Sequence, residues 1–294
     1  MKKLLLTFVY FACVIGFIIL FADYIGMTES EAFLIFISSV LLYFLFIVIS
    51  KLRYIKIKKR PKRKHAKRKF IIIIPFLIIS CLFLYNHNKK VEIPEALVTF
   101  GEKYPEALNF VNDYPKNYNK HHHINIKNQV KKGEIPLFIQ WDERWGYENY
   151  GSNFLAVNGC GPTCLSMVYC GLTGDTSLNP LKMADFSDSK GYYISGQGTS
   201  WSLMTEGAKA LGLNVKTGTV SEKYIKENLT KSTPIICSVR KGDFTYSGHF
   251  IVLTGIDSDG NIILNDPNSK INSQKHWSIQ RLLPQIKNLW VYSV

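Results

Sequence analysis

Three long apolar runs in the first 85 residues constrain this chain more than any other feature of its sequence. Residues 4–22 and 32–50 are each 19 residues long without a charge, and residues 70–85 form a third run of 16 that contains Pro75. About 20 apolar residues cross the hydrocarbon core of a bilayer, and proline is tolerated in such helices. A cleaved signal peptide is the competing interpretation of the first run, but no small-residue cleavage site follows it. The runs therefore predict three transmembrane helices.

The positive charge of the chain is concentrated between two of these runs. The net charge is +14, with 14 basic against 3 acidic residues in 1–85 and 22 against 19 in 86–294. Twelve of the basic residues lie in 51–69, a segment with too few aromatic residues to stack on nucleic-acid bases. Because cytoplasmic loops are enriched in Lys and Arg, the pattern predicts a multi-pass protein of the cell membrane with an extracellular C-terminal domain and no nucleic-acid partner.

The globular core is expected in the C-terminal half, since all five tryptophans follow residue 140. Residues 86–133 are interpreted as a helical stalk or linker, or as a helical extension packed on the domain, and residues 134–294 as the folded domain. Three consecutive histidines, His121 to His123, lie in the linker. Adjacent histidines do not direct several ligands at one ion, so neither a metal nor any other cofactor is expected.

The strongest local signal is Cys160, which lies between two glycines and just before Pro162. Proline suits the first turn of a helix, and the apolar residues that follow predict a helix ending near Gly171. A cysteine at a helix N-terminus is exposed to unpaired backbone N–H groups and to the positive end of the helix dipole, which stabilise a thiolate. Cys164, one turn further on, is expected to be a buried small residue. The disulfide state of Cys164, Cys170 and Cys237 is left open.

The second signal is a predicted hairpin that carries His249 on its first strand and Asp266 at the end of its second. A turn centred on residues 258–259 places Ile251 opposite Asp266. Side chains alternate along a strand, so His249 lies on the same face as Ile251 and is a diagonal neighbour of Asp266. The carboxylate is therefore expected to hold the imidazole.

Together, Cys160, His249 and Asp266 supply a nucleophile, a base and a group that orients the base. Gln140 is the upstream candidate for an oxyanion donor, together with the backbone N–H of Cys160; a surface glutamine is an equally good interpretation of that residue. A histidine that opens an apolar strand is, taken alone, more often an ordinary core or edge residue. The coincidence of the three groups is what favours catalysis.

At this point the sequence resembles the bacteriocin-processing-type cysteine peptidases, family thirty-nine of the papain-like clan, in a membrane-anchored stand-alone branch. The resemblance covers about residues 134–294 through five motifs in the same order, which read QWDERWGYENYG, GCGPTCLSMV, GYYISGQGTSW, SGHFIVLTG and NDPNS. It implies an α+β papain-like fold, with a nucleophile helix packed on an antiparallel sheet and preceded here by the three transmembrane helices. By position, it implies Cys160 as nucleophile, His249 as general base, Asp266 as its partner and Gln140 as oxyanion donor.

The chain departs from the exporter-linked members of that family, in which the peptidase is an N-terminal cytoplasmic domain. No G-x-x-x-x-G-K-[ST] phosphate loop occurs in the sequence, and Gln140 lies 20 residues before Cys160, further than in the exporter-type enzymes. The expected function is a membrane-anchored extracytoplasmic cysteine peptidase that acts on a peptide or protein. Two alternatives remain: hydrolysis or acyl transfer on peptidoglycan cross-peptides by the same residues, and a non-catalytic surface binding module on a papain-like scaffold. The oligomeric state is not predicted.

Overall fold

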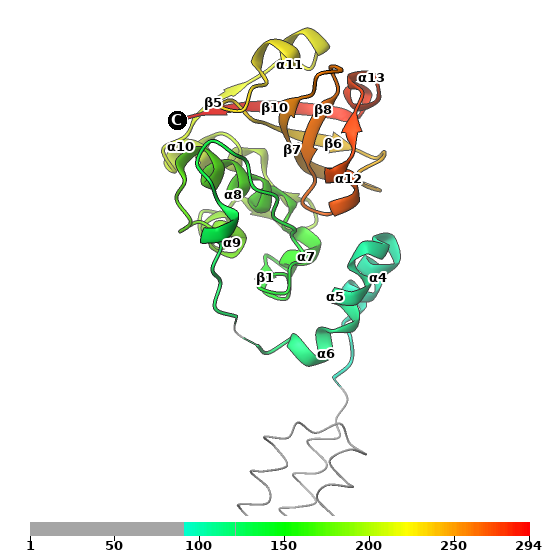
Figure 1. Ribbon diagram of the computed structural model, residues 1–294. Helices are drawn as coiled ribbons and strands as arrows, with labels where there is room; N and C mark the ends of the chain where they lie inside the picture. Colours follow the sequence, from blue (N-terminus) through cyan, green and yellow to red (C-terminus); the bar gives the residue numbers. More distant parts are fainter. Residues whose placement is uncertain (1–90, 121) are drawn as a thin grey trace, which may run out of the picture. The chain divides into compact units, whose positions relative to one another are not determined.

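A six-stranded antiparallel sheet lies at the centre of residues 91–120 and 122–294, the residues that this computed structural model describes (Figure 1). Its strand order is β5-β10-β6-β7-β8-β9. The strands are β5 (Asn214–Thr217), β6 (Ile235–Arg240), β7 (Gly248–Ile256), β8 (Ile262–Asn265), β9 (His276–Trp277) and β10 (Ile286–Ser293). Two small antiparallel pairs lie outside the sheet: β1 (Asn149–Tyr150) with β2 (Asn153–Phe154), and β3 (Tyr193–Ile194) with β4 (Gly198–Thr199).

Helices cover both faces of this sheet (Figure 1). The α-helices of the domain are α7 (Leu155–Asn158), α8 (Cys160–Thr173), α9 (Pro180–Ser189), α10 (Glu206–Ala210), α11 (Glu222–Asn228), α12 (Lys270–Gln274) and α13 (Ile279–Leu282). Short 3-10 turns are η3 (Lys127–Gln129), η4 (Trp201–Leu203) and η5 (Leu283–Gln285). Helices α8 and α9 share one hydrophobic cluster with the sheet, and α11 and α13 share the cluster on its other face.

The central strands are buried on both faces, which explains their nearly continuous apolar sequence. Along β6, Ile236 joins the cluster under α8, while Ile235 and Cys237 join the opposite cluster. Successive side chains of a strand point to opposite faces, so one strand serves both layers. Each fully buried aliphatic side chain contributes about 1.5–3 kcal/mol relative to an exposed one. The sheet is thereby held rigidly between the helices.

Helix α8 is 14 residues long and continues past Gly171, where the sequence predicted its end, to Thr173. Gly171 lacks a side chain for a packing reason: a Cβ there would lie 2.6 Å from a side-chain carbon of Ile135. The helix ends instead at Gly174, which has φ +77° and caps it in the left-handed conformation. The predicted helix end near Gly171 is therefore wrong, and the capping glycine is Gly174.

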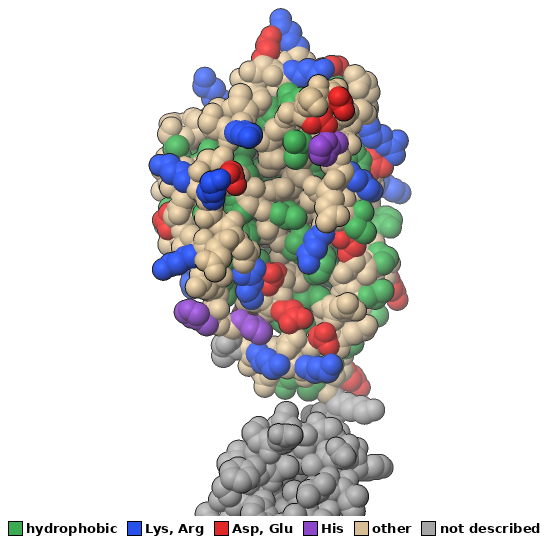
Figure 2. Space-filling model, viewed as in Figure 1, with side chains coloured by type: hydrophobic (Ala, Val, Ile, Leu, Met, Phe, Trp, Pro, Cys, Tyr) green, Lys and Arg blue, Asp and Glu red, His purple; other side chains and the backbone are tan. Residues whose placement is uncertain are grey.

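The N-terminal part of the described chain packs on the domain as a helical extension and is not a free stalk. It consists of α4 (Glu95–Lys103), η2 (Pro105–Ala107), α5 (Leu108–Asn112) and α6 (Tyr114–Asn117). Leu97, Phe100 and Phe110 of these helices form a third hydrophobic cluster with Ile139 and Ala156 of the domain. On the face seen in Figure 2, basic and acidic side chains are interspersed, as expected from the small charge excess after residue 85.

The predicted fold class, an α+β papain-like domain preceded by three transmembrane helices, is corrected to a mixed α/β domain. Among residues 91–120 and 122–294, no helix is both long and apolar enough to cross a membrane. The longest of them, α8, has 14 residues where about 20 are needed. The predicted spans at 4–22, 32–50 and 70–85 lie outside the described residues.

Candidate active site

Cys160 is the first residue of α8 and is partly exposed. The first backbone N–H groups of a helix have no acceptor within it, so this position concentrates positive electrostatic potential on the sulfur. The flanking glycine at 161 is required by packing, because a Cβ there would lie 2.7 Å from the side chain of Thr199. The local sequence therefore places a thiol at an open helix N-terminus, as predicted.

His249 and Asp266 meet on the hairpin formed by β7 and β8. The Nε2 atom of His249 lies 2.7 Å from Oδ1 of Asp266, and the two residues are 6% and 0% exposed. The imidazole is also in hydrogen-bond contact with the Cys160 side chain. Because Nε2 faces the carboxylate, Nδ1 is the ring nitrogen left for the sulfur. The structure thus brings the three predicted residues together.

The hairpin reaches the predicted register by an unpredicted route. Its connection is five residues long, Asp257 to Asn261, with Gly260 at φ +82°. This shifts the pairing by one residue from a turn centred on residues 258–259. A β-bulge at Thr254 then shifts it back, so Val252 pairs with Asn265 and the next residues along are Ile251 and Asp266.

The carboxylate of Asp266 is held in place by the loop that follows it. Oδ1 also accepts a hydrogen bond from the backbone N–H of Asn268 at 2.9 Å, and Oδ2 accepts one from Nδ2 of Asn272 at 3.0 Å. The backbone N–H of Asp266 donates to Oγ of Ser273 at 2.8 Å. A buried carboxylate with this many donors keeps one orientation, and with it the imidazole that it contacts.

The surroundings of His249 favour the imidazolium. Burial lowers the pKa of His249, but the charge and hydrogen bond of Asp266 and the contact with Cys160 outweigh it and raise the pKa to about 10. A protonated imidazole beside a nucleophilic sulfur can give its proton to a leaving group while the sulfur attacks a carbonyl carbon.

The stability of the fold should depend on pH through His249. Its folded-state pKa of about 10 lies above the ordinary 6.5, so the stabilisation is complete below pH 6.5 and is lost as the pH rises toward 10. Denaturant unfolding of wild type and His249→Ala at about pH 6 and about pH 10 checks this. The difference in free energy of unfolding between the two proteins should be larger at the lower pH. An equal difference at both values would contradict the raised pKa.

Gln140 is buried and lies between the nucleophile segment and the Asp266 loop. Its backbone N–H donates to the carbonyl of Pro267 at 2.7 Å, and its side-chain Nε2 donates to the carbonyl of Ala156 at 2.6 Å. Ala156 belongs to α7, the short helix directly before Cys160. An amide nitrogen carries two hydrogens, so one remains for a ligand. The equally weighted alternative, a surface glutamine, is wrong.

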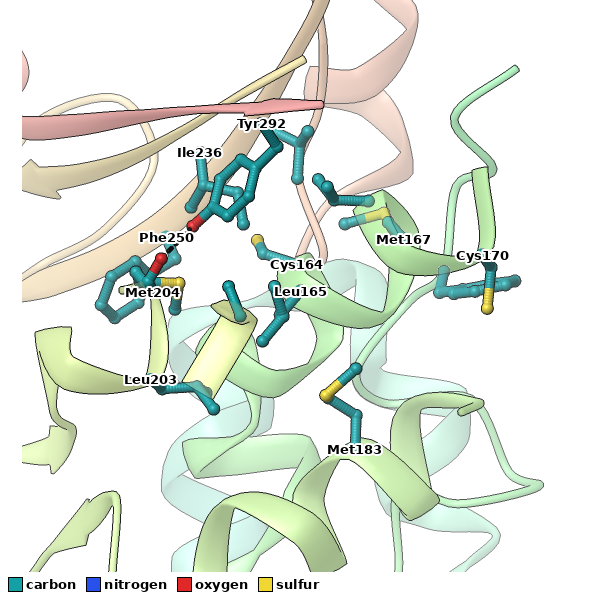
Figure 3. Packing of buried hydrophobic residues seen from close by; sticks show 14 of the residues in the cluster. Cys164, Leu165, Met167, Cys170, Met183, Leu203, Met204, Ile236, Phe250 and Tyr292 are labelled. Atoms are coloured by element: carbon teal, nitrogen blue, oxygen red, sulfur yellow. Dashed lines mark hydrogen bonds between the residues drawn. The ribbon is translucent and has the colours of Figure 1, made fainter. Parts of the chain in front are cut away.

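The other described cysteines are structural. Cys164, Cys170 and Cys237 are free thiols with less than 1% exposure, and burial raises the pKa of each, to about 12 for Cys170. Figure 3 shows Cys164 among the side chains between α8 and the sheet, near the Tyr292 hydroxyl that donates to the carbonyl of Met204 at 2.9 Å. The prediction of a buried small residue at Cys164 is confirmed.

Residues of the helical extension approach the site, although no sequence motif indicates that they contribute to it. The carboxylate of Glu106 accepts hydrogen bonds from Oγ of Ser269 and from the backbone N–H of Ile271. The hydroxyl of Tyr104 is in hydrogen-bond contact with Thr245, four residues before His249. No local pattern links such distant segments. The Asn and Ser residues after Asp266, in contrast, carry a signal, because Ser269 is the N-cap of α12.

The chain is similar to one family model and to solved structures of known proteins. The model of the Peptidase_C39 like family matches residues 132–293, more than half of the chain. Among solved structures, the peptidase domain of Streptococcus ComA, described as a bi-functional ABC transporter involved in a quorum sensing pathway, is 24% identical. That match covers 46% of this chain and 91% of the other, with a TM-score of 0.36. No curated protein matches the sequence.

Proposed function

We propose that this chain, which belongs to the Peptidase_C39 like family, is a cysteine peptidase that uses Cys160, His249 and Asp266 to hydrolyse peptide bonds. Cys160 is the nucleophile, His249 exchanges the proton, and Asp266 keeps the imidazole oriented and charged. The contact that carries the proposal is the 2.7 Å bond from a buried His249 to a buried Asp266, with the Cys160 side chain close to the same ring.

The reaction runs in two steps. The thiolate attacks the carbonyl carbon, and the imidazolium gives its proton to the leaving amine, which leaves a thioester on Cys160. His249 then takes a proton from water, the water attacks the thioester, and the acid product and the thiolate are released. During both steps the backbone N–H of Cys160 and the second hydrogen on Nε2 of Gln140 are the proposed donors to the oxyanion. Each step uses groups that the chain itself supplies.

A thiol probe tests this assignment on the full-length protein. Iodoacetamide at neutral pH should modify Cys160 first and abolish cleavage of a denatured protein such as casein in proportion to the modification. Cys164, Cys170 and Cys237 should stay unmodified, because they are buried and their thiol pKa values are raised. Mass spectrometry of the digested chain measures the modification of Cys160 and of the three buried cysteines. Cleavage that survives complete alkylation of Cys160 would exclude it as the nucleophile.

The same chemistry tests the proposed location outside the cell, which rests on the charge pattern of the sequence. A membrane-impermeant thiol reagent applied to intact cells should label the wild-type chain and leave a Cys160→Ala variant unlabelled. Labelling that appears only after the cells are lysed would place the site on the inner side.

A further inference from the structure

A cavity of about 240 Å³ lies beside the carboxylate of Asp266. It is enclosed by three segments that are far apart in the sequence: residues 103–106 of the helical extension, residues 242–246 before β7, and the loop and helix from 266 to 272. Pockets for drug-sized ligands have volumes of about 300–1,000 Å³, so this one has room for one or two side chains of a longer ligand.

The wall supplied by the extension is fixed to the rest of the site. Glu106 accepts hydrogen bonds from Ser269 and from the backbone N–H of Ile271, across the start of α12. Opposite, the ring of Tyr104 lies edge-on to the ring of Tyr246, with 6.0 Å between centroids. The family model begins only at residue 132, so this wall is an addition to the matched domain.

Asn268, which lines the cavity, is held in place. The residue is 4% exposed, and its Oδ1 atom is buried away from solvent. Its backbone is held on both sides, because its N–H donates to Asp266 and its carbonyl accepts from Nε1 of Trp141 at 3.0 Å. The loop that follows Asp266 therefore forms a fixed wall of the cavity.

The rest of the lining combines charged and apolar groups, and the charged ones include Lys103. The three carboxylates that line the cavity are already engaged: Asp266 with His249, Glu106 with the start of α12, and Asp243 in an ion pair with Arg281 at 2.6 Å. In contrast, Tyr246 and Ile271 are 62% and 52% exposed and present apolar surface at the cavity.

The position of the cavity relative to the reacting groups determines which part of a substrate reaches it. The imidazole of His249 gives its proton to the departing amine, so the amine side of the scissile bond lies on the His249 and Asp266 side of Cys160. The cavity is on that side, since Asp266 and Thr245 both line it.

We propose that this cavity, if Cys160 and His249 act as described above, is a subsite for the leaving-group side of the peptide. An apolar or aromatic side chain that follows the scissile bond packs between Tyr246 and Ile271. The helical extension, through Tyr104 and Glu106, thus contributes to substrate selection.

Cleavage-site profiling of full-length protein on denatured casein tests this subsite, with mass spectrometry of the products. Wild type should prefer bonds that are followed by Phe, Tyr, Leu or Ile. On a synthetic peptide containing such a bond, Tyr246→Ala and Ile271→Ala should each raise KM and lower kcat/KM about tenfold relative to a peptide with Gly in that place. Tyr118→Ala, which removes a 44% exposed tyrosine of the extension outside the cavity, should leave that ratio unchanged.

A thermal unfolding scan separates binding from a structural role. Because Tyr246 and Ile271 are 62% and 52% exposed, neither substitution should lower the unfolding temperature although each raises KM. Casein cleavage that depends on Cys160 but shows no selection after the scissile bond, or selection that both variants keep, would overturn the subsite and leave the proposed reaction intact. An absence of Cys160-dependent cleavage would overturn the reaction and the subsite together.

Discussion

Replacing Cys160 with alanine should lower peptide hydrolysis by about 10⁴-fold or more while the domain stays folded. Removing the nucleophile of a coupled catalytic unit eliminates nearly all of its rate enhancement. The thiol is partly exposed and alanine is a good helix former, so the start of α8 should form normally. Steady-state rates on a cleaved casein peptide and a thermal unfolding scan give both quantities.

The matched control is Cys164→Ala, one turn further along the same helix. That substitution removes a fully buried sulfur from the core and should cost about 1 kcal/mol of stability, yet the folded protein should retain its activity. The reverse pattern, in which Cys164→Ala abolishes hydrolysis and Cys160→Ala preserves it, would refute the assignment of the nucleophile.

Replacing Asp266 with alanine should lower kcat/KM by about 10³-fold and destabilise the fold by about 3–5 kcal/mol. The variant leaves His249 buried without its carboxylate and removes the acceptor for the backbone N–H of Asn268 and for Asn272. Asp266→Asn keeps the shape but removes the charge that raises the pKa of His249, so the alkaline limb of activity should move to lower pH. Denaturant unfolding and pH profiles measure these changes.

The same sheet offers a control in a second His–Asp pair, between β9 and the turn before β8. His276 lies 2.6 Å from Asp257, but this pair is at the far end of β8, and the histidine side chain is 52% exposed. His276→Ala should cost less than about 1 kcal/mol and leave kcat/KM within about twofold of wild type. If His276→Ala and Asp266→Ala lowered kcat/KM equally, the effect of Asp266 would be on the stability of the hairpin alone.

The parts of the site that were predicted correctly depend on residues close together in the chain. Gly159 and Pro162 mark the helix start around Cys160, and the alternation of β7 together with the length of the connection to β8 places Asp266 beside His249. Even there, the agreement needed the bulge at Thr254 to offset the longer turn. A bulge is a response to packing on both faces of the sheet and has no reliable signature in a single strand.

The packing of the helical extension could not be predicted from the local sequence pattern. Its amphipathic pattern predicts short helices, but the pattern does not distinguish a stalk from a segment packed on the domain, since both bury one apolar face. In the structure the segment packs against Ile139 and Ala156 of the domain, and this packing brings Tyr104 beside Thr245.

By itself, the sequence determined the chemical groups and their local geometry: a cysteine at a helix N-terminus and a histidine and an aspartate on one hairpin. These follow from capping, strand alternation and turn length, which act over a few residues. Only the tertiary structure decided what surrounds them. The bond from Ser269 to Glu106 joins residues 163 positions apart, and the extension completes the cavity beside Asp266. Contacts of that separation are set by which hydrophobic faces pack together, and no local propensity encodes them.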